Sequence, residues 1–170
     1  MYDIIITVGI PLSGKSTFSK FYSKKEGYVV ICPDTVRIAI HGNQFIHSAE
    51  PYVWATVDTM ARTFLLQENR IIIDATNTHK NARSRWIRLA KEFNKTIAAY
   101  VIATPFEECC KRNELLKRLD VSILNRMVNQ YQYPTKEEGL DAVIGVFYEI
   151  EYNGSINYIF KDNSEREIEQ

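Results

Sequence analysis

Short apolar runs rich in isoleucine and valine recur along the chain and alternate with longer segments of helical period. Continuous apolar runs of this length are typical of strands that are buried on both faces of a parallel sheet. The runs predict strands at Ile4 to Val8, Tyr28 to Ile31, Ile71 to Ile73, Ile97 to Ile102 and Ala142 to Phe147. The pattern therefore predicts an α/β fold with three layers and a central, mostly parallel sheet.

Two of the segments between these runs have a clear helical period. Pro51 suits the first turn of the earlier helix, and the apolar face that follows it consists of Val53, Val57, Met60, Ala61 and Phe64. In the helix expected from about Asn81 to Phe93, the apolar face consists of Ala82, Trp86, Leu89, Ala90 and Phe93. The opposite face gathers Lys80, Arg83, Arg88 and Lys91. A cationic face of this kind is usually solvated, and the alternative is that it follows the phosphates of a nucleic-acid strand.

The C-terminal part of the chain carries a hairpin signal. Residues 150–160 alternate in polarity around Asn153-Gly154, a dipeptide that favours a tight turn between antiparallel strands. No repeat or linker divides the sequence. We therefore expect one domain over residues 1–160, followed by a polar tail at 161–170.

Composition narrows the class of protein. With 170 residues, 45% hydrophobic and 25% charged, the chain is typical of a soluble globular domain and unlike a collagen, a coiled coil or a disordered tail. Its 21 basic and 21 acidic residues balance, so affinity for a nucleic acid or a membrane has to come from a local patch.

The cysteines and the first residues predict the compartment. Cys32, Cys109 and Cys110 include no C-x-x-C pair, which predicts free thiols in a reducing environment. The N-terminal apolar run is too short for a membrane span and lacks a basic start, so we expect a cytoplasmic protein without a membrane anchor. The three histidines have no metal-ligand spacing, so no zinc site is expected.

Residues 9–16 match the phosphate-binding pattern G-x-x-x-x-G-K-[ST], directly after one predicted strand and before a helical segment. Tight backbone turns at the glycines direct N–H groups inward, and the helix N-terminus adds its positive end. The expected nucleotide contacts are Gly9, Pro11, Leu12, Ser13, Gly14, Lys15, Ser16 and Thr17. Lys15 is expected to reach the β- and γ-phosphates of ATP, and the Ser16 hydroxyl to ligate Mg²⁺.

Two carboxylates are expected at the same sheet edge, because the carboxyl ends of parallel strands meet there. Asp34 follows the second strand, and its carboxylate is placed to take a proton from an acceptor hydroxyl; the alternative is a helix N-cap. Arg37 lies on the same helical face, ready to pair with an anionic part of the acceptor. Asp74 ends the third strand, where it would hold Mg²⁺. For Thr76 and Asn77, capping of the next helix is favoured over contact with the acceptor.

At these residues the sequence resembles the P-loop kinases of the polynucleotide 5′-hydroxyl kinase type, the kinase module of phage and bacterial end-healing enzymes. The matching blocks are Gly9 to Thr17, Asp34 with Arg37, Asp74 to Asn77, and Lys111-Arg112-Asn113 with the later Tyr133 to Gly139. The resemblance spans about residues 1–145, and its D-x-x-R and D-x-T-N blocks are narrower signatures than the phosphate loop. It implies an adenylate-kinase-like fold with a helical lid at about 109–130.

The resemblance also implies roles. Asp34 would be the general base on the 5′-hydroxyl, Arg37 would hold the neighbouring acceptor phosphate, and Arg112 would clamp the donor phosphates from the lid. A second lid cation falls on Lys117 or Arg118. Leu12 departs from the family, which usually has glycine there, so we expect an intact but stiffer loop.

The function that follows is transfer of the γ-phosphate of ATP, with Mg²⁺, to the 5′-hydroxyl of single-stranded or nicked DNA or RNA. The resemblance further implies partnership with a ligase or phosphatase; the sequence has no D-x-D-G motif, so no fused phosphatase is expected. The first alternative is a small-molecule kinase acting on a nucleoside, sugar, antibiotic or nucleotide-sugar. The second is an NTP-binding regulator that does not phosphorylate a separate acceptor. Base recognition by Tyr22, Tyr28, Tyr131 or Tyr133 is left open.

Overall fold

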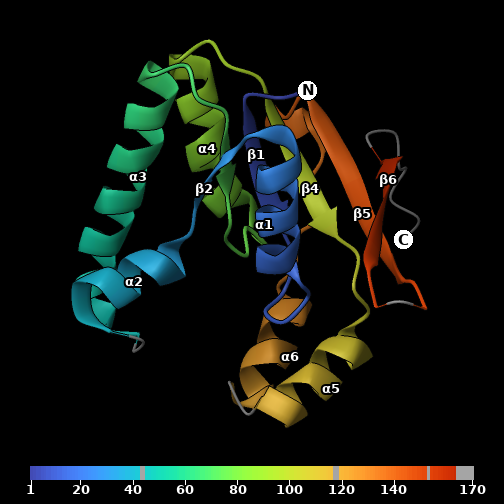
Figure 1. Ribbon diagram of the computed structural model, residues 1–170. Helices are drawn as coiled ribbons and strands as arrows, with labels where there is room; N and C mark the ends of the chain where they lie inside the picture. Colours follow the sequence, from blue (N-terminus) through green and yellow to red (C-terminus); the bar gives the residue numbers. More distant parts are fainter. Residues whose placement is uncertain (43–44, 117–118, 153, 164–170) are drawn as a thin grey trace.

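The computed structural model describes residues 1–42, 45–116, 119–152 and 154–163. A six-stranded sheet forms its middle layer, in the order β2-β3-β1-β4-β5-β6 (Figure 1). The strands are β1 (Ile4–Val8), β2 (Val29–Ile31), β3 (Ile71–Ile73), β4 (Ile97–Ile102), β5 (Ala142–Ile150) and β6 (Ile156–Asp162). The first five strands in this order pair in parallel, and β6 runs antiparallel to β5. The predicted α/β fold with a mostly parallel sheet and a C-terminal hairpin is confirmed.

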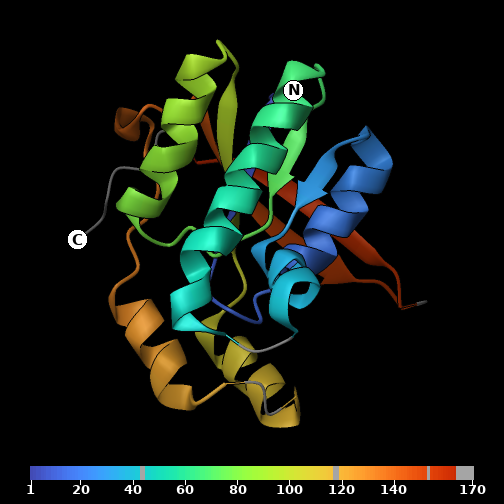
Figure 2. The ribbon, with the colours of Figure 1, turned by 90° about the vertical axis from the view of Figure 1, so that its left-hand side faces the viewer.

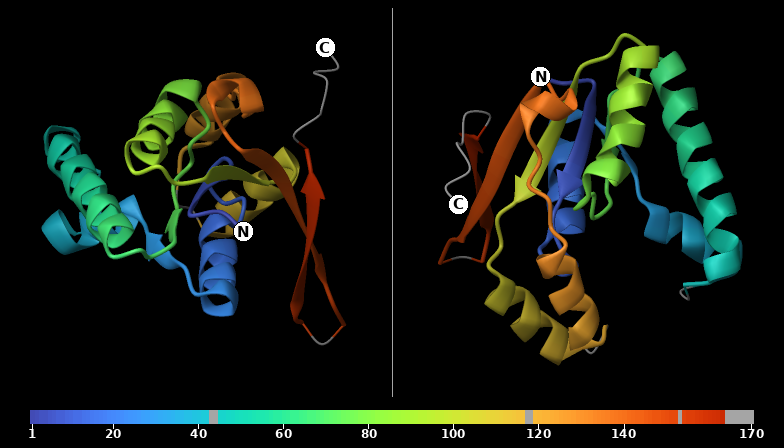
Figure 3. Two further views of the ribbon diagram at one scale, coloured as in Figure 1. Left: turned by 90° about the horizontal axis from the view of Figure 1, so that it is seen from above. Right: turned by 180° about the vertical axis from the view of Figure 1, so that it is seen from behind.

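Helices cover the two faces of this sheet (Figure 3). Their bounds are α1 (Lys15–Glu26), α2 (Pro33–His41), α3 (Glu50–Leu66), α4 (Lys80–Glu92), α5 (Phe106–Leu116) and α6 (Val121–Asn129), with 3₁₀ turns η1 (His47–Ala49) and η2 (Lys136–Glu138). One face packs into a core with α3 and α4, and the other with α1. Every residue of β1 is buried because the strand lies inside the sheet between two helical layers.

Strand order decides which loops meet. Since β3 lies between β2 and β1, and the three run in parallel, their carboxyl ends open at the same edge of the sheet. The phosphate loop leaves β1 at this edge, α2 begins after β2, and Asp74 follows β3. The fold therefore brings the three predicted motifs together.

The C-terminal hairpin is longer than the sequence pattern predicts. β5 continues to Ile150, and its turn is closed by bonds from the Glu151 N–H to Ser155 O (2.9 Å) and from the Gly154 N–H to Glu151 O (2.8 Å). Asn153 lies outside the described residues. β6 includes Lys161 and Asp162, so the expected polar tail begins later than residue 161; the division into one domain and a tail otherwise stays a prediction.

The faces of α4 correct the predicted pattern at two positions. Ala82 is exposed, whereas Arg83 is completely buried and pairs with Glu138 at 2.6 Å. Arg83 also donates to the carbonyl oxygens of Asn77 (3.0 Å) and Gln132 (2.8 Å). Arg83 thus does not belong to the cationic surface, because its guanidinium joins α4 to the chain around η2 inside the protein. Among the described helices, none is long and apolar enough to cross a membrane.

Candidate active site

The phosphate loop is held in an unusual backbone conformation. Leu12 has φ of 67° and Gly14 has φ of 97°, both in the left-handed region. A Cβ on Gly9 would lie 2.8 Å from Ser13 Oγ, so a side chain at this position would force the Ser13 hydroxyl to shift. Gly14 is the N-cap of α1, and no side chain caps this helix. The first-turn N–H groups of α1 consequently have neither intrahelical partners nor a capping side chain, which leaves them available to phosphate oxygens.

Lys15 lies folded against this loop. Its Nζ donates to the carbonyl oxygen of Ile10 at 2.7 Å, and the side chain is buried. Burial lowers the pKa of Lys15 to about 8, while the charge of Asp74 acts in the opposite direction. To bind a phosphate, the Lys15 ammonium group has to break its hydrogen bond to the Ile10 carbonyl oxygen. The charged oxygens of a polyphosphate would then accept its hydrogen bonds instead.

Asp74 lies near Ser16, the second residue of α1. Asp74 is 6% exposed, and burial raises its pKa. The nearby Ser16 side chain and the charge of Lys15 act in the opposite direction. A hydroxyl and a carboxylate suit Mg²⁺, which takes few protein oxygens and completes its shell with water and substrate phosphates. No group of three or more His, Cys, Asp or Glu side chains in the described ranges has a metal-binding arrangement.

Asp34 and Arg37 form an ion pair on the outer side of the same edge. Arg37 Nη1 lies 2.6 Å from Asp34 Oδ1, and the Asp34 side chain is 83% exposed. The alternative role of Asp34 as an N-cap is wrong, since Cys32 is the N-cap of α2 and Asp34 lies within its first turn. The carboxylate is therefore free of helix capping and open to an incoming group.

Glu50, at the start of α3, is a partner that sequence reasoning missed. It accepts bonds from Arg37 Nε and Nη2, each at 2.7 Å, and a third from Trp54 Nε1 at 3.1 Å. The bond from Arg37 is the main reason that the pKa of Glu50 is lowered. Nothing in the spacing of Arg37 and Glu50 predicts this pair, because the end of α2 and the 3₁₀ segment η1 lie between them along the chain.

The residues after Asp74 have structural contacts in place of the expected capping. His79 is the N-cap of α4, so the prediction that Thr76 or Asn77 caps this helix is wrong. Asn77 is buried with φ of 45°, donates to Thr7 O at 2.9 Å and accepts from Trp86 Nε1 at 3.3 Å. The Thr76 carbonyl oxygen accepts the Gly9 N–H at 3.0 Å. This segment thus fixes the base of the phosphate loop.

Arg112 reaches the phosphate loop from α5. Its Nη1 donates to Leu12 O at 3.0 Å, Nε to Glu108 Oε1 at 3.1 Å, and Nη2 to the Tyr148 hydroxyl. The Tyr148 contact, from β5, was not predicted by the sequence. Lys117 and Arg118, the two choices for a second lid cation, lie outside the described residues.

Asn113, the neighbour of Arg112, shapes the junction between α5 and α6, the pair in the predicted lid. Its side chain donates to Leu119 O at 2.8 Å and accepts from Leu119 N–H at 3.1 Å. Asp120 then caps α6 by accepting the Ser122 N–H at 2.8 Å. The two helices lie at the same end of the molecule as the phosphate loop (Figure 1).

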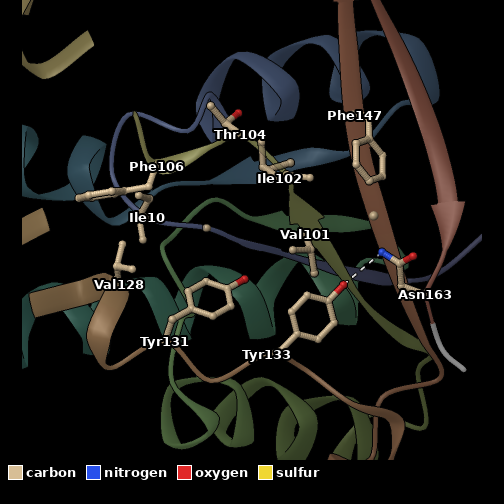
Figure 4. A pocket seen from close by; sticks show the side chains of 13 residues that line it. Ile10, Val101, Ile102, Thr104, Phe106, Val128, Tyr131, Tyr133, Phe147 and Asn163 are labelled. Atoms are coloured by element: carbon tan, nitrogen blue, oxygen red, sulfur yellow. Dashed lines mark hydrogen bonds between the residues drawn. The ribbon is translucent and has the colours of Figure 1, made fainter. Parts of the chain in front are cut away.

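Two cavities flank the phosphate loop and differ in character. One, of about 420 Å³, is lined by residues 12–17 together with Arg112, Tyr148, Ile150 and Ile156. The other, of about 290 Å³, is lined by Ile10, β4, Val128 and the rings of Tyr131, Tyr133 and Phe147, and no charged side chain lines it (Figure 4). Tyr133 accepts a bond from Asn163 Nδ2 at 3.1 Å in this apolar pocket. The first cavity, with Lys15 and Arg112 in its wall, is the one suited to a nucleotide polyphosphate.

Comparison with known families agrees with this geometry. A family model described as an AAA domain (AAA_33) matches residues 4–121, well over half of the chain, and the protein belongs to this family. Its fold and phosphate loop are those of an ATP-dependent P-loop kinase.

Individual relatives are distant. The chain is 24% identical to an L-seryl-tRNA(Sec) kinase of Methanococcus maripaludis, over 97% of this chain and 68% of that protein. It is 25% identical to a bifunctional polynucleotide phosphatase/kinase of Schizosaccharomyces pombe, over 94% of this chain and 37% of that enzyme. A chain in the Pnkp1/Rnl/Hen1 RNA repair complex has a TM-score of 0.70 and 27% identity, over 81% of this chain and 46% of that one. The chain therefore spans less than half of the two relatives whose names mention a polynucleotide or RNA repair.

Proposed function

We propose that this protein is a polynucleotide 5′-hydroxyl kinase, which transfers the γ-phosphate of ATP to the 5′-hydroxyl end of DNA or RNA. The observation that carries the proposal is the exposed Asp34 carboxylate, paired with Arg37 at 2.6 Å, at the sheet edge that also holds the phosphate loop and Asp74. An exposed carboxylate beside a phosphate cradle is suited to a hydroxyl acceptor that arrives from solvent.

In this proposal the chain's own groups position the donor. The first-turn amides of α1 and the Lys15 ammonium bind the phosphates, and Arg112 adds positive charge from α5. Ser16 and Asp74 would hold Mg²⁺, which supplies charge neutralisation between the phosphates. Since the transition state of phosphoryl transfer is loose and highly charged, most of the catalysis comes from positioning and electrostatics.

Asp34 acts on the acceptor. As the 5′-oxygen forms its bond to the γ-phosphorus, the bond from that phosphorus to the β–γ bridging oxygen breaks, and the hydroxyl proton passes to the Asp34 carboxylate. Arg37 orients that carboxylate and offers its remaining N–H groups to the acceptor. ADP leaves with the electron pair of the broken bond on its β-phosphate oxygen, and Asp34 later releases its proton to water.

Both sequence relatives support an acceptor linked to nucleic acid, because the name of one specifies seryl-tRNA and that of the other a polynucleotide. Partnership with a ligase or phosphatase is part of the same proposal. It is supported by the phosphatase/kinase pairing in the Schizosaccharomyces pombe enzyme and by the multi-protein complex that contains the structural relative.

One observation favours a second candidate, a small-molecule kinase. Glu50 and Asp34 together engage three of the N–H groups of Arg37, which leaves less of the guanidinium for an acceptor phosphate. An acceptor without a phosphate would suit such a paired arginine.

The two candidates are separated by offering labelled ATP and Mg²⁺ with three acceptors: a 5′-hydroxyl oligonucleotide, a nucleoside 3′-phosphate and the plain nucleoside. We expect kcat/KM to be highest for the oligonucleotide and lowest for the nucleoside, with transfer to each reduced by about 10²- to 10⁴-fold in Asp34→Asn. Equal values for the nucleoside and the oligonucleotide would overturn the polynucleotide assignment in favour of the small-molecule kinase.

A further inference from the structure

An exposed aromatic ring lies beside the proposed acceptor site. Phe45 is 66% exposed and follows α2 in the chain leading to η1. Its ring lies 5.7 Å from the Arg37 guanidinium carbon and 6.4 Å from the His47 ring. Single exposed apolar residues are common on protein surfaces. This one differs because it contacts the arginine that pairs with Asp34.

Other exposed apolar side chains lie close to Phe45 along the chain. Ile38 on α2, Ile46 beside Phe45 and Tyr52 on α3 are exposed by 57%, 38% and 71%. Ile38 and Tyr52 lie on the two helices that carry Arg37 and Glu50, and Ile46 lies between these helices, just before η1. Figure 2 shows α2 and the beginning of α3 in the half of the molecule where α5 and α6 also lie. Phe45 contacts the acceptor side of the site through Arg37, and these residues are not among those that line the nucleotide cavity.

From these contacts we infer that Phe45 forms a stacking platform for the 5′-terminal nucleobase of the acceptor strand. The inference rests on the proposed function, in which Asp34 meets the 5′-hydroxyl. The terminal base belongs to the same nucleotide as that hydroxyl. On the protein side, Arg37 contacts both Asp34 and Phe45, so the carboxylate and the aromatic ring lie close enough to meet one nucleotide.

Charge explains why the occupant is a base and not a phosphate. Arg37 is bonded by two carboxylates, so the cluster of Asp34, Arg37 and Glu50 carries a net negative formal charge. The two remaining N–H groups of Arg37 can hold one acceptor phosphate, but a further anion is unfavourable beside this cluster, whereas a neutral planar base gains from an aromatic face. Every nucleobase has such a face, so the platform favours acceptors with an unpaired terminal base and is tolerant of which base it is.

The test is a double-mutant cycle between Phe45 and the terminal base. Wild type and Phe45→Ala are each given two 5′-hydroxyl oligonucleotides, identical except that one has an abasic 5′-terminal nucleotide. We expect Phe45→Ala to lower kcat/KM for the normal acceptor by about 5- to 100-fold. Removal of the terminal base should lower kcat/KM of the wild type by a similar factor. It should hardly change kcat/KM of Phe45→Ala, because the two changes delete the same contact.

Matched controls separate stacking from folding defects. Leu66→Ala removes an apolar side chain that is 72% exposed at the far end of α3, and should leave both acceptors unaffected. Phe45→Trp should retain the preference for a terminal base, and KM for ATP should not change in any of these variants. Independent, multiplying losses from Phe45→Ala and from the abasic end would overturn the platform while leaving the kinase proposal intact. Absence of transfer to any oligonucleotide by wild type would overturn the kinase proposal and the platform with it.

Discussion

Both carboxylate oxygens of Glu50 accept hydrogen bonds from Arg37, one from Nε and one from Nη2, each at 2.7 Å. The pair joins the first residue of α3 to the middle of α2, and the two side chains are only 14% and 17% exposed. Two parallel bonds fix the plane of a guanidinium as well as its position. Glu50 is therefore a positioning residue for Arg37, and through Arg37 for Asp34.

Glu50→Gln is expected to destabilise the fold by about 1 to 3 kcal/mol at pH 7, because a half-buried arginine loses its bidentate partner. The bond from Arg37 lowers the pKa of Glu50 below its ordinary 4.5. Its contribution is thus complete above that ordinary value and is lost as the pH falls through the lower, folded-state pKa. Urea unfolding from pH 7 to 3 should show the gap between wild type and variant closing at the acidic end. A constant gap would contradict this role; Glu68→Gln, at a side chain that is 78% exposed, is the control.

Asp34→Asn is expected to reduce phosphoryl transfer by about 10²- to 10⁴-fold, the range for loss of a general base. Its side chain is 83% exposed and caps no helix, so the variant should fold normally. ATP affinity, measured by calorimetry, should change by only a few-fold. Near-complete activity in the variant would remove Asp34 from the role of base.

Leu12→Gly tests the cost of the loop conformation. A side chain at φ of 67° is strained by about 1 to 2 kcal/mol, and glycine avoids this clash. We expect the free energy of unfolding to rise by roughly 1 kcal/mol, while the hydrogen bond from Arg112 to the Leu12 carbonyl oxygen is kept. Glu68, with φ of 58°, offers the same change away from the site. A loss of stability in Leu12→Gly, with a gain in Glu68→Gly, would show that packing of the Leu12 side chain outweighs the strain.

Arg83→Met is expected to destabilise the protein by about 3 to 5 kcal/mol, since it leaves Glu138, which is 5% exposed, as a buried charge without its partner. Arg88→Ala, on the exposed side of α4, should change stability by less than about 0.5 kcal/mol. Chemical denaturation of the two variants makes the comparison. If the Arg83→Met and Arg88→Ala variants are equally stable, the structural role of the buried Arg83 pair with Glu138 is contradicted.

The sequence predicts the strands well because continuous apolar runs are what a doubly covered parallel sheet requires, and it places the motifs at one edge because strand ends in such a sheet coincide. It errs at Ala82 and Arg83, where a long polar side chain occupies an interior position because Glu138 and two carbonyl oxygens satisfy it. Periodicity treats every arginine as a surface residue and cannot register such partners.

Other contacts of the site could not be predicted from the sequence, because they also depend on tertiary structure. The Glu50 pair with Arg37 and the Tyr148 contact with Arg112 join elements that are distant along the chain, and no spacing rule links them. Asn77 has the right residue type for a cap, but its amide is engaged by Thr7 and Trp86 in the core. Local propensity is overridden where tertiary contacts offer a buried polar group better partners.

The most direct measurement of the central claim is transfer of labelled γ-phosphate, with ATP and Mg²⁺, to two oligonucleotides of identical sequence, one with a 5′-hydroxyl and one already 5′-phosphorylated. We predict label on the hydroxyl end alone, and about 10²- to 10⁴-fold slower labelling when Asp34 is replaced by alanine. Label on neither oligonucleotide, by a protein that still binds ATP, would contradict it.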